Sequence, residues 1–349
     1  MEVLFIYKED YPWDVRVEKI INLLSRNKFD VMLLCRNTEG RHRVEYSNGI
    51  RIVRLPSTKG FFKLCSLPMF LNPLWIISIY KCIKNNNPKV IVVRDLPLMP
   101  IAIFFGRLLG LRVLFDMAEC YPEMYRTMLK YGKNKILNFL IRNPNVYDAI
   151  EGWVIKRCDH VFVMIEESEM RLLKKGITPE KISIVSNTPS RNNIFQLREY
   201  NMKSIIRVIY VGFITRIRGL DNLLYGISKY YSNNPQIGIE ANIIGIGDDL
   251  PYLQNMSKEL DSERYVFFHG WANHEKVRKM MEESDIGILP YKNCRHWNTT
   301  IPNKIFDYMA YGMPVLATPI KPIKKILQSE KCGLIFAENN SDSFVRTIR

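Results

Sequence analysis

Short apolar runs alternate with amphipathic helical patterns along nearly the whole chain of 349 residues. This alternation is typical of doubly wound parallel sheets, so the sequence predicts an α/β protein. The first half should begin with a strand at 3–7 and a helix at 15–27. Its other strands are expected at 31–35, 50–55, 90–95, 112–116, 160–165 and 182–186, and its other helices at 75–86, 100–109, 135–157 and 166–175.

A stretch rich in turn residues divides the chain. Residues 187–193 read Asn-Thr-Pro-Ser-Arg-Asn-Asn and polar sequence continues to 204, so we expect a linker at 188–204. The alternation then restarts, with strands at 207–211, 240–244, 265–269, 285–290 and 315–318 and helices at 220–231, 274–283 and 341–349. The length favours two domains. We predict domains at 1–187 and 205–349, with ligands in a cleft at the carboxyl ends of their strands.

The stretch 299–318 has the most specific helix signals. Thr299 or Thr300 is expected to cap a helix, with Pro302 in its first turn. Gly312 is expected to end that helix, and a proline two residues later prevents its continuation.

Two polar residues of this helix suggest a ligand. Asn303 and Asp307 are four residues apart, so they project from one face near the positive N-terminal end. A carboxylate there can accept hydrogen bonds from two vicinal hydroxyls while free backbone N–H groups face an anion, which fits a ribose with a diphosphate. Two plainer interpretations stay open: an acid favoured by the helix dipole, or a surface pair of Lys304 and Asp307.

Two glycine turns follow predicted strands. Gly245-x-Gly247 is only a fragment of the dinucleotide-binding fingerprint and gives little support to a nicotinamide enzyme. The turn 212–219 places Arg216 and Arg218 between a strand and a helix, where guanidinium groups can bind a diphosphate bidentately. A solvent-exposed basic turn is the alternative.

The composition indicates the class of protein and the redox state of its compartment. Hydrophobic residues make up 47% of the chain and charged residues 24%, as in ordinary globular proteins. Seven cysteines are scattered without metal-binding spacing, which indicates a reducing compartment and argues against zinc or a disulfide framework. Glu2 occupies the region where a signal peptide is basic, so the N-terminus is interpreted as a strand and the protein as cytoplasmic.

The net charge of +15 is concentrated in one segment. Residues 36–112 hold 13 Lys and Arg against three acids. Within it, 60–77 is apolar and aromatic, but prolines and an asparagine interrupt it, so it is too short to span a bilayer. Bases among Phe and Trp fit a surface resting on anionic lipid at the inner face of the cell membrane. A solvated basic face over a core helix is the alternative, and no motif supports nucleic-acid binding.

Several segments, taken in order, resemble the retaining glycosyltransferases of family 4, which have the GT-B fold and use nucleotide-sugar donors. The matching segments are Tyr11-Pro12-Trp13-Asp14-Val15-Arg16-Val17-Glu18-Lys19, Arg94-Asp95-Leu96-Pro97-Leu98, Asp116-Met117-Ala118-Glu119-x-Tyr121-Pro122, Ser186-Asn187-Thr188-Pro189, Tyr210-Val211-Gly212, Arg218-Gly219-Leu220, Phe268-His269-Gly270-Trp271, Asp285-Ile286-Gly287-Ile288-Leu289-Pro290 and Thr300-Ile301-Pro302-Asn303-Lys304. The resemblance covers nearly the whole chain and implies two Rossmann-like domains facing across a cleft.

The resemblance implies a donor site in the second domain. Asp307 matches the second of the family's two paired glutamates, which binds ribose, and Thr299 stands in place of the first. Arg218 matches a diphosphate-binding lysine; Phe213 replaces the family's arginine, for which Arg216 is the candidate substitute. The other implied donor-side residues are Gly270 and Trp271 beside the nucleobase, and Thr300, Asn303 and Lys304 in the helix motif.

In the first domain, the resemblance implies that Asp116 and Glu119 are catalytic and that Asp14 and Arg16 lie on the acceptor side. Capping of a helix after the strand is the alternative role for Asp116 and Glu119. It further implies transfer with retention, with no cofactor and no metal because basic groups stabilise the departing diphosphate. The product would be a glycan or lipid-linked sugar of a surface polysaccharide or lipopolysaccharide, made by a hexosyl- or N-acetylhexosaminyltransferase. Members of this family usually continue past the equivalent of Arg349, so we expect either that the second domain is truncated or that it closes onto the first in a different way.

Two other functions fit the same scaffold. A sugar-nucleotide epimerase would use the same donor without an acceptor. A catalytically silent partner would bind the nucleotide sugar without turnover, an interpretation that the replacement of the first glutamate by Thr299 keeps open.

Overall fold

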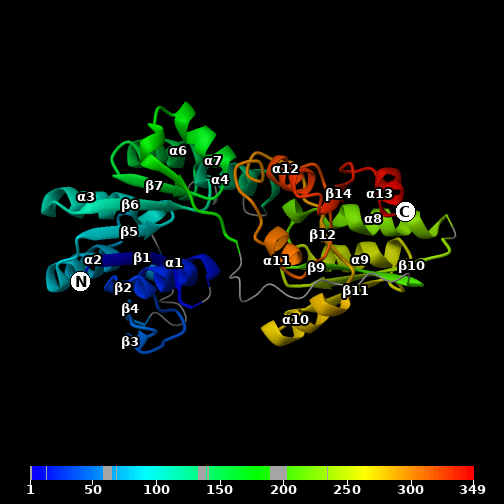
Figure 1. The fold of residues 1–349 in the computed structure, drawn as a ribbon, viewed down its shortest axis with the longest axis horizontal. Helices are drawn as coiled ribbons and strands as arrows, with labels where there is room; N and C mark the ends of the chain where they lie inside the picture. The colour runs from blue at the N-terminus through cyan, green and yellow to red at the C-terminus, as the bar shows by residue number, and fades with distance from the viewer. Residues whose placement is uncertain are drawn as a thin grey trace. The chain divides into compact units, whose positions relative to one another are not determined.

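The computed structural model describes residues 2–12, 14–57, 65–67, 69–132, 139, 141–188, 203–233 and 235–349. The chain separates into two compact units, Met1–Asn187 and Thr188–Arg349 (Figure 1). Most of the predicted linker, 189–202, lies outside the described residues, as do 58–64 and residue 68 of the basic segment.

The N-terminal unit contains a sheet of eight strands. In spatial order they are β3 (Val44–Ser47), β4 (Ile50–Arg54), β2 (Val31–Arg36), β1 (Val3–Asp10), β5 (Val90–Arg94), β6 (Arg112–Met117), β7 (His160–Val163) and β8 (Ile182–Ile184). All neighbours are parallel except β3 and β4. Starting from β1, the chain first adds strands on one side and then returns to β5 on the other, so a topological switch point lies between β1 and β5.

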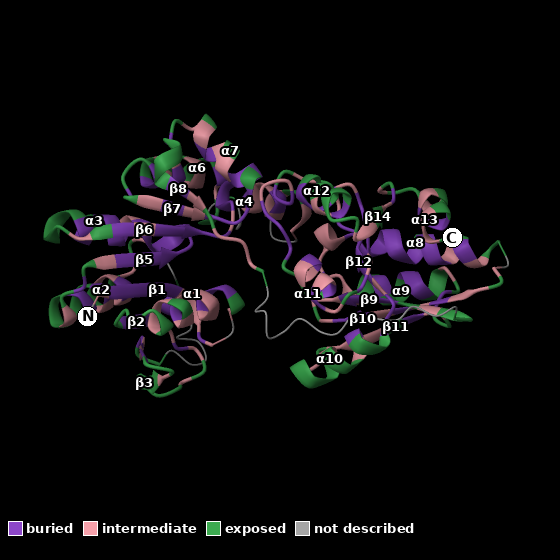
Figure 2. Ribbon diagram, in the orientation of Figure 1, coloured by how far each residue is buried: buried purple, intermediate pink, exposed green. Residues whose placement is uncertain are grey.

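Helices cover both faces of this sheet. They are α1 (Val15–Arg26), α2 (Pro73–Asn86), α3 (Met99–Leu109), α4 (Tyr121–Tyr131), α6 (Pro144–Ile155) and α7 (Glu166–Lys174). Val17 and Ile21 of α1 pack with one set of strand side chains. The larger cluster, which includes Trp75 and Phe115, packs α2, α3, α4 and α6 against the opposite set (Figure 2).

Two parts of this unit differ from prediction. The helix expected at 135–157 is not continuous: residues 139 and 141 are helical, but a separate helix, α6, begins at Pro144, and the Asn143 side chain caps it. The strand β4 was predicted at 50–55, but its hairpin partner β3 and the helix α4 were not predicted. Asn48 and Gly49, both with positive φ, form the hairpin turn, and this dipeptide is a recognised hairpin signal.

The C-terminal unit contains a parallel sheet of six strands. In spatial order they are β11 (Val266–Gly270), β10 (Gly238–Ile244), β9 (Ile205–Val211), β12 (Ile286–Leu289), β13 (Val315–Ala317) and β14 (Gly333–Ile335). Its helices are α8 (Leu220–Tyr231), α9 (Leu250–Glu259), α10 (His274–Glu283), α11 (Lys304–Ala310), α12 (Lys321–Ser329) and α13 (Ser341–Ile348). Of these elements, α9, α12 and β14 were not predicted. The switch point lies between β9 and β12.

The start of α11 corrects the prediction for 299–318. Asn303 is the N-cap and Lys304 the first helical residue, so the helix has only seven residues. The Thr299 hydroxyl donates to the backbone carbonyls of Arg295 and His296 and therefore does not cap it. Gly312, with a φ of 66°, follows the helix end as expected.

In the part of the chain that the structure describes, no helix combines the length and the hydrophobicity that crossing a bilayer requires. All seven cysteines are free thiols.

The loops after β9 and β10 lie in direct backbone contact. Gly212 N–H donates to the Ile244 carbonyl at 2.8 Å and Ile214 N–H donates to the Ile246 carbonyl at 2.9 Å, so the strand ladder continues into the loops. A side chain on Gly245 would overlap the Gly212 carbonyl, and one on Gly247 would overlap that of Ile214. Close backbone packing therefore explains the Gly-x-Gly pair without a dinucleotide.

Gly245→Ala should destabilise the C-terminal unit by about 2 kcal/mol or more, because overpacking adds to the strain of an alanine at a φ of 147°. Gly270→Ala is the matched control, since its φ is also positive but its Cβ would meet no atom within 4 Å. Urea unfolding followed by circular dichroism measures both. Equal destabilisation by the two substitutions would contradict this role of Gly245.

Candidate functional site

Two loops meet at the switch point of the C-terminal sheet. The first, 212–219, follows β9, and the second, 290–303, follows β12. Because neighbouring parallel strands end at the same edge, both loops lie at the carboxyl edge, where open α/β sheets bind ligands. The sequence-predicted donor residues Arg218 and Lys304 come from these two loops or directly follow them.

Aromatic side chains hold Arg218 in place. Its Nη1 donates to the Tyr291 hydroxyl at 2.6 Å, and its guanidinium carbon lies 4.4 Å from the centre of the Trp297 ring. The Trp297 indole N–H donates to the Ile217 carbonyl at 3.2 Å, which ties the second loop to the first. Stacking and a directed hydrogen bond therefore fix a permanent positive charge at the switch point.

Lys304 brings a second positive charge to the same edge. Its side chain crosses Gly212 so closely that a Cβ there would overlap the Lys304 Cε. Burial and the charge of Arg218 lower the pKa of Lys304 to about 8, with Asp307 opposing them. Among the described residues no carboxylate lies within ion-pair distance of the Lys304 ammonium. The two bases therefore lie close enough for the charge of Arg218 to lower the pKa of Lys304.

Asp307 and Asn303 lie one helical turn apart, and both are exposed. The Asp307 N–H donates to the Asn303 carbonyl at 3.1 Å. The Asp307 carboxylate reaches solvent, yet protein atoms surround its inner side; this burial raises its pKa, against the opposing effect of Lys304. The alternative of a Lys304–Asp307 ion pair is wrong, since the structure shows none between these two described residues.

Arg216 points elsewhere. Its guanidinium lies 3.9 Å from the Asp249 carboxylate and 4.4 Å from the centre of the Tyr252 ring. Both partners belong to the start of α9, so the structure separates Arg216 from the pair formed by Arg218 and Lys304.

The remaining donor-side predictions are spread along the edge. Gly270 ends β11, the outer strand of the sheet, and the following Trp271 is 72% exposed. Thr300 is buried in the loop after β12.

Sequence reasoning missed the aromatic support of Arg218. Tyr291 and Trp297 flank it, and His296 packs against Trp297 with 4.7 Å between ring centres. Burial and the Arg218 charge lower the pKa of His296 to about 4, so its ring is neutral at pH 7. The available signal was the cluster of a tyrosine, a histidine and a tryptophan within eight residues of the end of β12.

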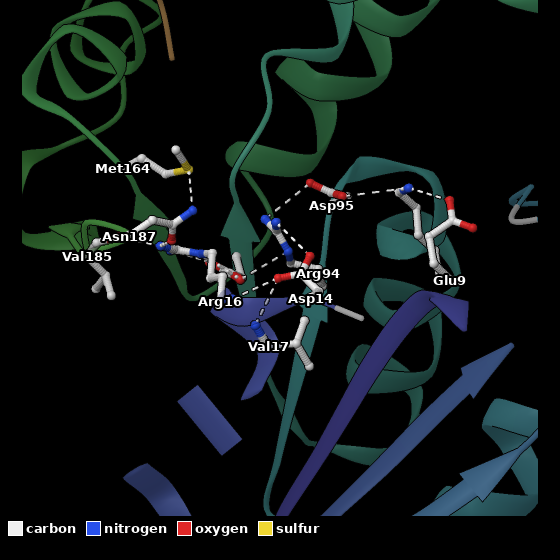
Figure 3. A network of polar contacts seen from close by, with 11 residues as sticks. Glu9, Asp14, Arg16, Val17, Arg94, Asp95, Met164, Val185 and Asn187 are labelled. Atoms are coloured by element: carbon white, nitrogen blue, oxygen red, sulfur yellow. Dashed lines mark hydrogen bonds and ion pairs between the residues drawn. The ribbon is translucent and has the colours of Figure 1, made fainter. Parts of the chain in front are cut away.

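In the N-terminal unit, Asp116 is fully buried at the end of β6. Arg16 Nε donates to its two carboxylate oxygens at 2.9 and 3.1 Å. The same guanidinium donates to the Val185 carbonyl and, at 2.8 Å, to Asn187 Oδ1 (Figure 3). Arg16 therefore ties the start of α1 to β6 and to the chain after β8.

Asp14 extends this network. As the N-cap of α1, its carboxylate accepts hydrogen bonds from the N–H groups of Arg16 at 2.9 Å and Val17 at 3.0 Å. Arg94 Nη2 donates to Asp14 at 3.2 Å (Figure 3). Burial alone would raise the pKa of Asp14, but Arg94 and the two backbone donors lower it.

Asp95 belongs to the segment 94–98, which resembles the family, but it was not predicted as a site residue. It is buried, has a φ of 71°, and its Oδ1 accepts no hydrogen bond from any described residue. Its carboxylate lies 3.5 Å from Arg94 and 3.9 Å from Lys8. Burial raises its pKa, with both bases opposing. A buried acid directly after the strand 90–94 was the available signal for Asp95.

Glu119 is half-buried in the loop between β6 and α4.

Sequence comparison matches each unit separately. Residues 14–188 match the family described as glycosyl transferase 4-like domain, and residues 206–349 match glycosyl transferases group 1. An uncharacterized glycosyltransferase of Haemophilus influenzae is 27% identical over 62% of this chain and 56% of its own length. The amylovoran biosynthesis glycosyltransferase AmsK of Erwinia amylovora is 25% identical over 50% of this chain and 42% of its own. The chain thus spans about half the length of the curated relatives it matches.

Solved structures show the same fold. Sucrose-phosphate synthase of Thermosynechococcus elongatus has a TM-score of 0.76 at 14% identity, over 100% of this chain and 88% of that chain. Anabaena HepE, solved in complex with UDP and glucose, has a TM-score of 0.68 at 12% identity, over 100% and 89%. The fold is therefore the GT-B arrangement of two parallel-sheet domains. With its N-terminal unit matching a glycosyl transferase 4-like domain and its C-terminal unit matching group 1, the chain belongs to the glycosyltransferases.

Proposed function

We propose that this protein transfers a sugar from a nucleotide-sugar donor to a hydroxyl of a glycan or lipid-linked acceptor in surface polysaccharide or lipopolysaccharide synthesis. The observation that carries the proposal is that Arg218 and Lys304 bring two positive charges together at the switch point. The UDP and glucose bound by HepE and the amylovoran synthesis named for AmsK support it.

A diphosphate would bring negative charge to this pair of bases. The guanidinium of Arg218 can donate two parallel hydrogen bonds and the ammonium of Lys304 a third. Both groups are partly shielded from water, where charge-assisted hydrogen bonds are stronger than in bulk solvent. Asp307, exposed one turn along α11, is the residue that would accept hydrogen bonds from the ribose hydroxyls. Trp271 offers an exposed ring on which a nucleobase can stack.

The same charges can assist the chemical step. As the bond from sugar to phosphate breaks, negative charge grows on the departing diphosphate, and bases already in position stabilise it without reorganisation. We infer a reaction in which the acceptor attacks on the face from which the diphosphate leaves, so that the configuration is retained. The departing phosphate then takes the acceptor proton, and the two bases do the work that a divalent metal does in other transferases.

In the N-terminal unit, the contacts favour a positioning role for Asp116 over the predicted catalytic one. Its carboxylate is buried and already engaged by Arg16, with Arg94 Nε at 3.8 Å. Through Arg16 it holds Asn187 and the start of α1. Glu119, which is half-buried rather than sealed, is the better candidate to orient an acceptor hydroxyl.

The donor is identified by a thermal-shift screen against UDP-, GDP-, ADP- and CMP-sugars, because a ligand that binds only the folded protein raises its Tm. With that donor, nucleoside diphosphate release should require an acceptor. Release of the epimeric nucleotide sugar without acceptor would favour an epimerase, and binding without turnover a silent partner.

Arg218→Met and Lys304→Met should each weaken binding of the nucleoside diphosphate by about 10- to 100-fold, since each removes charge-assisted hydrogen bonds. Arg216→Met is the matched control and should have a much smaller effect, because that side chain lies with Asp249 and Tyr252. Titration calorimetry measures all three. A loss at Arg216 as large as at Arg218 would contradict the assignment.

Binding of the diphosphate should weaken as the pH rises above about 8, where free Lys304 loses its proton. The affinity should fall by nearly tenfold per pH unit as long as Lys304 stays protonated in the complex with the diphosphate. Lys304→Arg should remove this dependence and keep tight binding at pH 9.5, because a guanidinium stays protonated. Lys304→Met should remove it with weak binding throughout. A wild-type affinity that is constant from pH 7 to 9.5 would refute the role of Lys304.

Asp116→Asn should destabilise the N-terminal unit by about 3 kcal/mol or more, because it leaves Arg16 buried beside a neutral group. It should lower kcat while leaving the affinity for the nucleoside diphosphate unchanged. Arg41→Ala, which breaks an ion pair whose two side chains are 38% and 43% exposed, should change stability by less than about 1 kcal/mol. Denaturant unfolding and calorimetry test both; full kcat in a folded Asp116→Asn protein would exclude the positioning role.

A further inference from the structure

We propose that the outer faces of α2, α3 and α6 form a surface that docks on an anionic lipid bilayer. These helices lie side by side on one face of the N-terminal sheet, since α3 contacts both α2 and α6. We call this surface the helical face. The proposal rests on the proposed function for its purpose, which is to bring the enzyme to a lipid-linked acceptor.

Large apolar side chains of the helical face lie open to solvent. Phe104 and Leu108, one turn apart on α3, are 61% and 64% exposed. Ile77 and Tyr80 on α2 and Trp153 on α6 are 51%, 39% and 39% exposed. A single exposed apolar residue is ordinary in a globular protein, but a group on three contacting helices indicates an interaction site. The outer turns of α2 and α3 are green in Figure 2.

Basic side chains stand among these apolar ones. Lys81 and Lys84 of α2, Arg107 of α3, and Lys156 and Arg157 at the end of α6 are all exposed. Two of them lie against aromatic rings of the face: the Arg157 guanidinium carbon is 4.8 Å from the Trp153 ring centre, and the Lys84 ammonium is 5.8 Å from that of Tyr80.

Acids hardly offset this charge. The sequences of α2 and α3 contain none. The two acids of α6 are both engaged by Lys175, which lies 3.0 Å from Asp148 and 2.7 Å from the buried Glu151. The helical face therefore presents a net positive charge together with exposed apolar side chains, which complements anionic headgroups above acyl chains.

The lysines favour a bilayer over a protein partner. Lysine is depleted in protein–protein interfaces, whereas exposed lysines beside tryptophan and phenylalanine are typical of helices that lie in a membrane interface. The face is built from the sides of packed helices, so it would rest on the bilayer without spanning it. This location refines the membrane surface predicted from 36–112, because α6 lies outside that segment.

The test is sedimentation of the full chain with vesicles of phosphatidylcholine alone or with 30% phosphatidylglycerol. Wild type should bind the anionic vesicles, less so at high salt. A variant with Lys81→Glu, Lys84→Glu and Arg107→Glu should lose binding by on the order of 100-fold, since each base near an anionic surface contributes about fivefold. The matched control makes the same charge change on α10 with Lys276→Glu, Arg278→Glu and Lys279→Glu, all at exposed positions, and should bind nearly as wild type.

A second pair tests the apolar part. Phe104→Ser should weaken vesicle binding, and Phe267→Ser, at a 38% exposed position in the other unit, should not. Equal binding by wild type and the α2–α3 charge variant would overturn the proposal. So would a wild-type dimer that Phe104→Ser dissociates without any vesicle binding, which would assign the face to a second copy. Nucleoside diphosphate affinity measured without lipid should be unchanged in every variant, so a failure of the donor site is seen separately.

Discussion

The proposed donor site depends on one interaction in the C-terminal unit, the repulsion between the positive charges of Arg218 and Lys304. The fold keeps both at one sheet edge although each disfavours the other, which is one reason for the lowered pKa of Lys304. Stacking on Trp297 and the bond to Tyr291 hold Arg218 against this repulsion. A bound anion would relieve this repulsion, which is the physical basis of the proposed donor site.

In the N-terminal unit, by contrast, buried positive charges lie beside buried negative charges. Arg16 and Arg94 are surrounded by the carboxylates of Asp14, Asp95 and Asp116, and most of these groups are hydrogen-bonded to one another. Such a network satisfies itself and fixes backbone segments that are far apart in sequence. Arg94 and Asp95 are exceptions: Nε and Nη1 of Arg94 and Oδ1 of Asp95 make no hydrogen bond with the described residues, and Asp95 has a positive φ. A non-glycine residue with a strained backbone conformation is often found at a functional site.

Periodicity predicted most strands and several helices, α8 and α10 with their observed bounds, because these elements bury a regular apolar pattern. It failed where local signals competed. Thr299, Thr300 and Asn303 are all good N-caps, and only tertiary packing decides that α11 starts after the third. The burial of Asp116 was not predictable either, since its partner Arg16 lies 100 residues away in the chain.

The separation of Arg216 from Arg218 shows the limit most clearly. Both lie on one short loop, so the sequence alone assigns them the same ligand. The loop forms a 3₁₀ turn, Arg216–Arg218, in which each residue rotates by about 120° and residues two apart point to different sides. One arginine therefore joins Asp249 and Tyr252, and the other joins the aromatic pair near Lys304. Residue type and spacing locate a charge on an edge, but the backbone conformation of three residues decides which of the two charges lies near Lys304.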